Sequence, residues 1–170
     1  MTGQVTIERD DRVAIVRFDT GKAANALSQA LLEELTNAAK DFHACPDISA
    51  VILTGRQDNF SMGADLKDPD KSGGPKAPLS QRRIALRRGP ALCDAWEKVD
   101  ALTICAIEGW CIGGGMALAA SCDLRVCSEA STLYVPEVER GMNMSWGSIP
   151  RFVALIGPAR TKRLAALCEK

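Results

Sequence analysis

Histidine and metal-binding cysteine motifs are scarce in this sequence, which leaves little for a metal site. His43 is the single histidine among 170 residues, and no second ligand stands at metal-binding spacing from it. Seven cysteines are present, but they form no CxxC pair and most lie in apolar runs. We interpret them as small core residues of a protein from a reducing compartment, because disulfide frameworks are typical of short secreted chains. We expect no bound metal ion, and we expect His43 at the surface.

An excess of charge of either sign and a long apolar run are also missing. The chain has 21 lysines and arginines against 21 aspartates and glutamates, so its composition does not indicate nucleic acid or an anionic membrane as a partner. Glu108, Asp123 and Arg125 interrupt the most apolar region, which falls short of the roughly 18–20 residues of a membrane span. The first residues, MTGQVTIERDD, match neither a secretory signal nor a transit peptide. These features predict a cytoplasmic protein that binds neither nucleic acid nor membranes.

The sequence does contain an alternation of strand-like and helix-like segments within one domain of ordinary size. Strands are predicted where apolar residues alternate or form short β-branched runs, at 4–9, 12–18, 49–55, 102–107 and 123–128. Three helices are predicted. The first is capped by Ser28 and ends at about 42, the second runs from about 81 to 98, and the third covers 114–120. The polar stretch 68–80 is interpreted as a loop, since no separate core precedes or follows it. This order predicts an α/β domain formed by residues 1–170.

Three consecutive glycines, residues 113–115, follow the predicted strand 102–107 and open a predicted helix. Glycine is a poor residue at a helix start unless something comes close to the backbone. Such a turn presents free backbone N–H groups at the positive end of a helix dipole, and so attracts negative charge. The alternative is that the glycines only permit tight helix packing. A dinucleotide-binding fingerprint and a P-loop are excluded, because GxGxxG and GK[ST] are both absent.

A second glycine-containing turn, NFSMGADLKD at 59–68, follows the predicted strand 49–55 in the same way. Two strand ends that each offer backbone donors can converge on one oxygen atom. The pair of turns therefore favours an anion-stabilising site over simple helix packing.

Four motifs in order resemble the signatures of the crotonase superfamily, the enoyl-CoA hydratases and isomerases. They are GKAANALS at 21–28, FSMGADLKD at 60–68, AIEGWCIGGGMALAASCDLRV at 106–126 and VPEVERGMNMSWGSIPRF at 135–152. The resemblance spans nearly the whole chain and implies a crotonase-like spiral of repeated ββα units that binds acyl-coenzyme A thioesters. It also implies a homo-oligomer, a trimer or a dimer of trimers, and no cofactor apart from the coenzyme A of the substrate.

The resemblance assigns roles to residues of these turns. It implies that the backbone N–H groups of Ala64 and Gly114 hold the thioester oxygen, where charge accumulates in an enolate. The residues it places along coenzyme A are Lys22, Ala23 and Ala24 at the pantetheine and phosphates, Ala64, Asp65 and Leu66 near the adenine, and Gly113 together with Gly114. Taken alone, Lys22 is equally consistent with an ordinary turn residue.

The acid–base residues depart from the family's pattern. Hydratases of the family use two glutamates; Glu137 matches the second, whereas Ala117 stands at the position of the first. Because Ala117 cannot transfer a proton, a two-carboxylate hydration is in doubt. Moving a double bond needs one base that removes a proton and returns it to another carbon, and Glu137 alone can do that. We expect the pKa of Glu137 to be raised by an apolar surround of Trp110, Met142 and Trp146.

Several residues near Glu137 have two interpretations. Some relatives carry a second carboxylate where this chain has Ser145, so Ser145 and Asn143 are candidates to orient water or a substrate oxygen instead. Glu139 is interpreted as a surface residue with Arg140 as its partner. Met142, Met144 and Trp146 are consistent with the wall of an acyl pocket and equally with core packing.

Charged residues elsewhere are interpreted as structural or solvated. Arg83 and Arg87 lie one helical turn apart, an arrangement able to meet coenzyme A phosphates, but a solvated helix face is favoured. Asp123 is expected to act as a turn or cap partner between a helix and a strand.

The last residues, TKRLAALCEK, are expected to stop in mid-helix without a capping signal. Because members of the family are considerably longer, we expect the final helices to be missing and four apolar side chains to be uncovered, Leu155, Ile156, Leu164 and Leu167.

Three classes of function stay open at this point. An enolate-forming isomerase, hydratase or dehydratase with one glutamate is preferred. A CoA-thioester hydrolase would use the same backbone donors with Glu137 activating water. A non-catalytic assembly protein that keeps the fold would account for Ala117 and the short chain.

Overall fold

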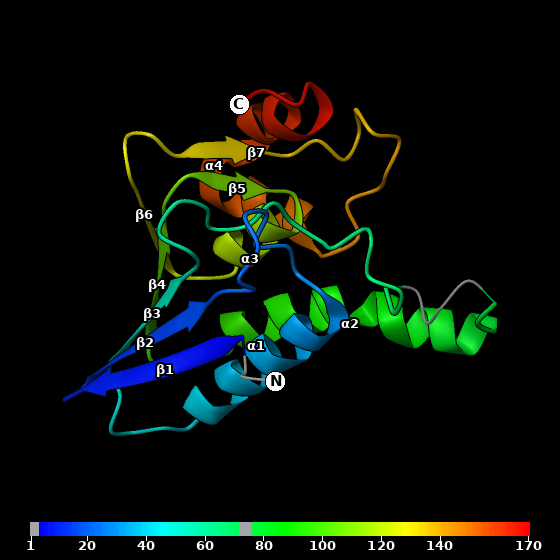
Figure 1. The fold of residues 1–170 in the computed structure, drawn as a ribbon. Coiled ribbons are helices and arrows are strands. Elements are labelled where there is room, and N and C mark those ends of the chain that lie inside the picture. The colour runs from blue at the N-terminus through cyan, green and yellow to red at the C-terminus, as the bar shows by residue number, and fades with distance from the viewer. Residues whose placement is uncertain (1–3, 72–75) are drawn as a thin grey trace.

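The computed structural model describes residues 4–71 and 76–170 and has two sheets flanked by helices (Figure 1). The first sheet contains β1 (Val5–Asp10), β2 (Val13–Phe18), β3 (Ala50–Thr54), β4 (Leu102–Ile107) and β6 (Leu124–Cys127) in that spatial order. β1 and β2 pair as an antiparallel hairpin, and the other neighbours pair in parallel. The second sheet pairs β5 (Trp110–Ile112) in parallel with β7 (Thr132–Tyr134). The helices are α1 (Gln29–Phe42), α2 (Leu79–Glu97), α3 (Gly114–Ala120) and α4 (Ser148–Ala166).

The predicted strands and helices are confirmed to within about two residues at each end. Ser28 caps α1, since its hydroxyl accepts a hydrogen bond from Leu31 N at 3.3 Å. The sequence did not indicate β5 or β7, and of α4 it indicated only the C-terminal part, within residues 161–170. The two strands have three residues each, too short for a period-two pattern to show. Within α4, Gly157 has a positive φ and Pro158 follows, so helical periodicity is interrupted. Residues 72–75 of the predicted 68–80 loop lie outside the described residues.

The core lies between the first sheet and the helices α1 and α2, which cover one of its faces (Figure 1). Inward residues of β2 such as Val16 and Phe18 are fully buried, and they pack with Leu31, Leu35 and Trp96 of the two helices. The Phe18 ring meets Phe60 edge to face at 5.2 Å between centroids. This packing anchors the segments that follow β2 and β3, which border the candidate site.

The cysteine and histidine predictions are confirmed in part. All seven cysteines are free; Cys93, Cys105, Cys111 and Cys122 are buried, but Cys127 is exposed. Burial raises the pKa of the Cys93 thiol to about 11. His43 is exposed, and its Nδ1 lies 2.9 Å from Lys98 O. Among the described residues, no helix is both long and apolar enough to cross a membrane.

The C-terminal segment differs from the prediction. α4 ends at Ala166, and Cys168 adopts a positive φ of 52°, the left-handed conformation that often ends a helix. Leu155, Ile156 and Leu167 are exposed as predicted, but Leu164 is partly buried and packs against the core. The prediction for Leu164 was therefore wrong, because α4 turns that side chain inward.

Asp123 has the structural role that the sequence indicated. Its carboxylate accepts hydrogen bonds from Thr103 N at 2.8 Å and from Thr103 Oγ1 at 2.7 Å, and the same hydroxyl accepts from Asp123 N at 2.8 Å. Thr103 is buried in β4, so these bonds tie the turn after α3 to the sheet that supports the glycine turn.

We expect Asp123→Ala to lower the free energy of unfolding by about 1.5–3 kcal/mol, the usual range for hydrogen bonds to a charged group. Urea denaturation followed by circular dichroism measures this change. Asp10→Ala, at the exposed end of β1, is the control and should change stability by less than about 0.5 kcal/mol. An equal effect of both substitutions would contradict the structural role of Asp123.

Candidate active site

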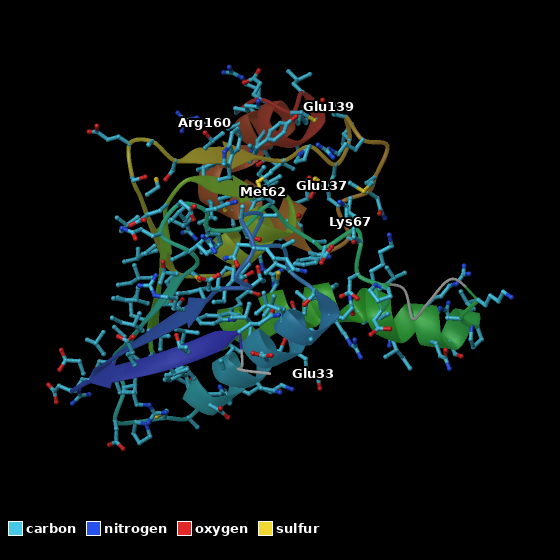
Figure 2. The ribbon with its side chains drawn as sticks, viewed as in Figure 1. Glu33, Met62, Lys67, Glu137, Glu139 and Arg160 are labelled. Atoms are coloured by element: carbon cyan, nitrogen blue, oxygen red, sulfur yellow. The ribbon has the colours of Figure 1, made fainter. Side chains whose placement is uncertain are left out.

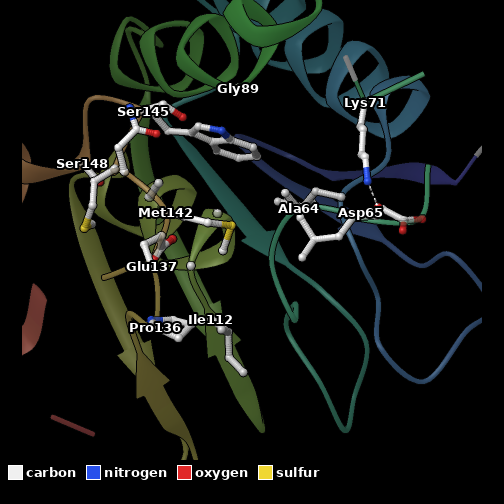
Figure 3. Close-up of a pocket in the computed structure, with 18 of the residues that line it drawn as sticks. Ala64, Asp65, Lys71, Gly89, Ile112, Pro136, Glu137, Met142, Ser145 and Ser148 are labelled. Carbon is white, nitrogen blue, oxygen red and sulfur yellow. Dashed lines mark hydrogen bonds between the residues drawn. The ribbon is translucent and has the colours of Figure 1, made fainter. Parts of the chain in front are cut away.

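A cavity of about 760 Å³ opens between α1, α2, the turn after β3 and the segment after β7 (Figure 3). Figure 3 shows Pro136, Glu137 and Met142 on one side of it and Ala64 and Asp65 on the other. Leu27 and Leu32 from α1 and its cap region, and Ala85 and Gly89 from α2, complete an apolar lining. A largely apolar cleft with a few polar groups is the usual form of a small-molecule site.

Asn25 joins three segments below this cavity, and it was not among the residues that the sequence motifs singled out. Asn25 is fully buried with a positive φ of 41°. Its Nδ2 donates to Phe18 O and Phe60 O, and its Oδ1 accepts from Thr20 N. Ser61 Oγ donates to Asn25 O at 2.8 Å. Asparagine tolerates the left-handed conformation better than most residues, and that is the signal the sequence offered.

The two glycine-containing turns meet at the cavity, as their sequence positions predicted. Ser61 N donates to Trp110 O, and Ile112 N donates to Ser61 O, both at 2.9 Å. A Cβ placed on Gly114 would lie 3.3 Å from Ala64 N, so these two residues approach each other closely. Within the described part of the chain, neither Ala64 N nor Gly114 N donates to a loop or turn acceptor. Gly114 is the first residue of α3, so its N–H has no intrahelical acceptor either.

Glycine is required at two positions beside these N–H groups. Gly63 has a φ of +88°, and a Cβ there would lie 2.7 Å from Ile112 O. Gly113 has a φ of +51°, and a Cβ there would lie 2.8 Å from Glu137 Oε1. Both conformations are rare for residues with a side chain. At Gly63 the obstructing atom belongs to the backbone, whereas at Gly113 it is the end of the Glu137 side chain. Gly63 and Gly113 therefore allow close packing of the two turns, and they leave the neighbouring N–H groups of Ala64 and Gly114 facing the cavity.

Glu137 lies in the turn after β7, half-buried beside Gly113. Its Oε2 is buried and has no hydrogen-bond partner among the described residues. Burial raises the pKa of Glu137 above its ordinary value, although the positive charge of Arg140 acts to lower it. A carboxyl group that is unpaired, partly buried and in a cleft is typical of proton-transfer sites.

Two of the three residues expected around Glu137 line the cavity with it, and the third does not. Met142 and Trp146 line the cavity with Glu137, and Met142 N donates to Glu137 O at 2.7 Å. Trp110 does not line it: its side chain is exposed, and Lys170 Nζ lies 5.7 Å from the ring centroid. Alternation along β5 explains the difference, because Cys111 faces the core and turns Trp110 away.

Glu139 and Glu137 diverge because the chain turns between them (Figure 2). Glu139 is exposed and accepts a hydrogen bond from the Tyr134 hydroxyl, so its partner is Tyr134 rather than the expected Arg140. Glu139 is thus a surface residue, as predicted. Among the described lining residues, the carboxylates are Glu137 and Asp65, and Asp65 Oδ1 accepts from Lys67 N at 2.9 Å.

Ala117, Asn143 and Ser145 also line the cavity. Ala117 is buried on α3, facing the same space as Glu137, and it supplies no polar atom from its side chain. Asn143 and Ser145 are exposed near the opening. Because both residues line the cavity, they stay candidates to orient water or a substrate oxygen.

The residues expected along coenzyme A fall into two groups. Asp65, Leu66, Gly113 and Gly114 line the cavity together with Ala64. The turn holding Lys22, Ala23 and Ala24 is exposed and lies beside the cavity rather than in its lining. Asn59 Nδ2 donates to Ala23 O at 2.6 Å, and Met62 N donates to Ala24 O at 2.9 Å. This turn is therefore held against the segment that carries Ala64.

Arg83 and Arg87 lie on the exposed face of α2. Arg83 and Arg87 are outside the cavity lining, whereas Ala85, Leu86 and Gly89 of the same helix belong to it. The favoured interpretation, a solvated helix face, agrees with this placement.

Comparison with known proteins supports one family. The family model for enoyl-CoA hydratase/isomerase matches residues 8–170. A probable enoyl-CoA hydratase of Mycobacterium bovis is 31% identical over 163 residues, which cover 94% of this chain and 60% of that protein. The short-chain-enoyl-CoA hydratase of Clostridium acetobutylicum is 30% identical over 161 residues, with the same two coverages. This chain therefore spans about 60% of the length of these curated relatives.

Solved structures show the same fold. An enoyl-CoA hydratase from Bacillus anthracis superposes with a TM-score of 0.88 at 29% identity, covering 98% of this chain and 64% of that one. The fold prediction, an α/β crotonase-like spiral, is thereby confirmed. The extent of the family match and the shared fold establish that the chain belongs to the enoyl-CoA hydratase/isomerase family of the crotonase superfamily.

Proposed function

We propose that this protein acts on an enoyl-CoA thioester, stabilises its enolate with two backbone N–H groups and transfers protons through Glu137. The observation that carries the proposal is the unpaired Oε2 of the Glu137 carboxyl group, which lies beside Gly113, close to the free N–H groups of Ala64 and Gly114. An anionic intermediate and the base that forms it need to be this close. The acyl-CoA ligand agrees with the family to which the chain belongs.

In the proposed reaction, the thioester oxygen lies between Ala64 N and Gly114 N. Removal of a proton from the α carbon of a 3-enoyl ester, or from the γ carbon of a 2-enoyl ester, turns this oxygen into an enolate oxygen. Two preorganised donors stabilise the charge that develops there, and loss of one such donor typically costs about 10²–10³ in rate. Gly114 has no side chain to obstruct the oxygen.

Double-bond isomerisation is the reaction that the acid–base residues support best. Glu137 removes a proton from one carbon and returns it to another two carbons away, so a single carboxyl group suffices. Ala117 faces the cavity with a methyl group, and Asp65 lies on the opposite wall, bound to the backbone of its own turn (Figure 3). Hydration would need a second group to position water, for which Asn143 and Ser145 are the candidates.

Membership of the family also supports proposals about coenzyme A binding and about assembly. We propose that Lys22, Ala23, Ala24, Asp65 and Leu66 bind coenzyme A and that the protein forms a homo-oligomer. The exposed side chains of Leu155 and Ile156 on α4 are compatible with assembly.

The reaction is tested by incubating 2-enoyl-, 3-enoyl- and 3-hydroxyacyl-CoA esters with the protein in deuterated water. Isomerisation places deuterium at the α or γ carbon without net addition of water. We expect Glu137→Gln to lower this rate at least about 100-fold, since a positioned acid–base group contributes typically 10²–10⁴. Mass spectrometry of the esters measures both. Glu139→Gln, two residues away at the surface, is the control and should leave the rate unchanged.

Undiminished turnover by Glu137→Gln would contradict the role of Glu137. A gain of water by the enoyl ester would replace isomerisation with hydration. Release of a free thiol would identify hydrolysis, and binding without any turnover would identify a non-catalytic protein.

The pH dependence follows from the raised pKa of Glu137. The base must be ionised, so turnover is expected to fall as pH decreases through this pKa, at a pH above the ordinary range of glutamate. The positive charge of Arg140 lowers the pKa of Glu137, so removing that charge should move the midpoint of the profile to higher pH. Profiles of kcat/KM against pH, which report the free enzyme, measure both effects for the wild type and Arg140→Met. If the midpoint of the pH profile were the same in the variant, the fall of turnover at low pH could not be assigned to Glu137.

A methyl group at Gly114 should block the proposed oxygen position. Its Cβ would lie 3.3 Å from Ala64 N and 2.9 Å from the Trp146 ring, without the strain of a positive φ. We expect Gly114→Ala to lower turnover by about 10²–10³, the usual cost of losing one such donor, while binding of free coenzyme A is retained. Enzyme kinetics and calorimetric titration of coenzyme A measure the two quantities. Loss of coenzyme A binding in parallel with turnover would indicate general damage instead.

A further inference from the structure

The indole ring of Trp146 spans the space between α2 and α3 at the inner part of the cavity. A Cβ placed on Gly89 of α2 would lie 2.2 Å from Cε2 and 2.4 Å from Nε1 of this ring. A Cβ placed on Gly114 of α3 would lie 2.9 Å from Cη2 and Cζ3. One aromatic ring therefore lies against the backbone of both helices, at a glycine in each case.

Gly89 is placed where a glycine is otherwise unfavourable. It lies in the interior of α2, a helix of 19 residues, and is buried. Glycine is, apart from proline, the poorest residue in a helix interior. Any side chain at this position would occupy the space that the Trp146 ring fills. The pair Gly89 and Trp146 is therefore a packed unit.

The backbone of Trp146 is held in place from the α2 side. Arg151 Nη1 lies 3.3 Å from Trp146 O and 3.2 Å from Gly147 O, donating to both. Arg151 Nη2 donates to Asp94 at 2.8 Å and to Glu97 at 2.6 Å, both on α2. A largely buried guanidinium with four acceptors fixes the segment that carries the ring.

The far edge of the ring borders the proposed thioester oxygen. A Cβ placed on Gly114 would lie 2.9 Å from Cη2 and Cζ3 of the ring and 3.3 Å from Ala64 N. The ring edge and the two N–H groups therefore border the same small volume. An acyl chain bound with its carbonyl at these N–H groups would meet the ring within its first few carbons. The indole fills the space between Gly89 of α2 and Gly114 of α3, so it stands in the path of a longer chain.

We propose that Trp146 determines acyl-chain specificity and restricts the site to short acyl groups. This inference rests on the proposed acyl-CoA function. It concerns the length of the acyl chain that the cavity accepts, and it does not depend on which proton transfer Glu137 performs.

The test measures dissociation constants of the saturated thioesters butyryl-, octanoyl- and dodecanoyl-CoA by calorimetric titration, because these ligands bind without an enoyl reaction. We expect the wild type to prefer butyryl-CoA. Trp146→Ala should shift the ratio of dodecanoyl to butyryl affinity at least about tenfold toward the longer chain, since each methylene accepted by an apolar pocket is worth roughly 10–200-fold. An unchanged ratio would overturn the proposal. If Trp146→Ala does not fold, Trp146→Leu takes its place, with the same expectation.

Gly89→Ala provides a second measurement that does not require a ligand. In the wild type it should lower the midpoint of thermal unfolding, because the new methyl group displaces the ring. In the Trp146→Ala background it should leave the midpoint unchanged or raise it, because alanine is the better helix former. Equal effects in both backgrounds would overturn the packing on which the proposal depends.

The two proposals fail in different ways. Chain-length-selective binding that Trp146→Ala alters, without turnover of any enoyl ester, would overturn the proposed reaction and support the role of Trp146. Turnover that depends on Glu137, with an unaltered chain-length ratio, would overturn the role of Trp146 alone.

Discussion

The close approach of two backbone segments, residues 61–64 and 111–114, is the constraint on which the rest of the site depends. Reciprocal hydrogen bonds of 2.9 Å join Ser61 with Trp110 and Ile112, and glycine at 63 lets the chain pass within contact of Ile112 O. This contact aligns the first turn of α3 with the turn after β3. The contact also places the free N–H groups of Ala64 and Gly114 close together at the cavity.

Burial of a polar network below the cavity maintains this approach. Asn25 and Ser61 connect the turn after β2 to the turn after β3 through bonds to three main-chain carbonyls, and both are fully buried. A buried polar group with all its bonds made specifies one arrangement, since any displacement leaves it unsatisfied. The hydrophobic core between the sheet and α1 and α2 supplies stability, and this network supplies the position of the site.

Glu137 acquires its chemical character from tertiary contacts. The residue reaches the cavity only because β7 pairs in parallel with β5, which places the turn after β7 beside Gly113. Its carboxyl group is half-buried in a cavity that Met142 and Trp146 also line, and this burial raises its pKa. Trp146 adds a second function to the same segment, because its ring closes the space between the helices that flank the proposed oxygen site.

The sequence by itself determined the five strands of the first sheet, the helices α1 to α3, the cap at Ser28, the family, and the two turns that would meet. These features depend on local periodicity, capping and spaced motifs. The sequence did not reveal β5 and β7, which are three-residue strands formed by pairing rather than by propensity. Only the tertiary structure decided that Trp110 turns away from Glu137, that Leu164 is covered, that Asn25 joins three segments, and that Gly89 makes room for an indole ring. These outcomes depend on which side chains distant in the chain compete for the same space, and no local pattern encodes that competition.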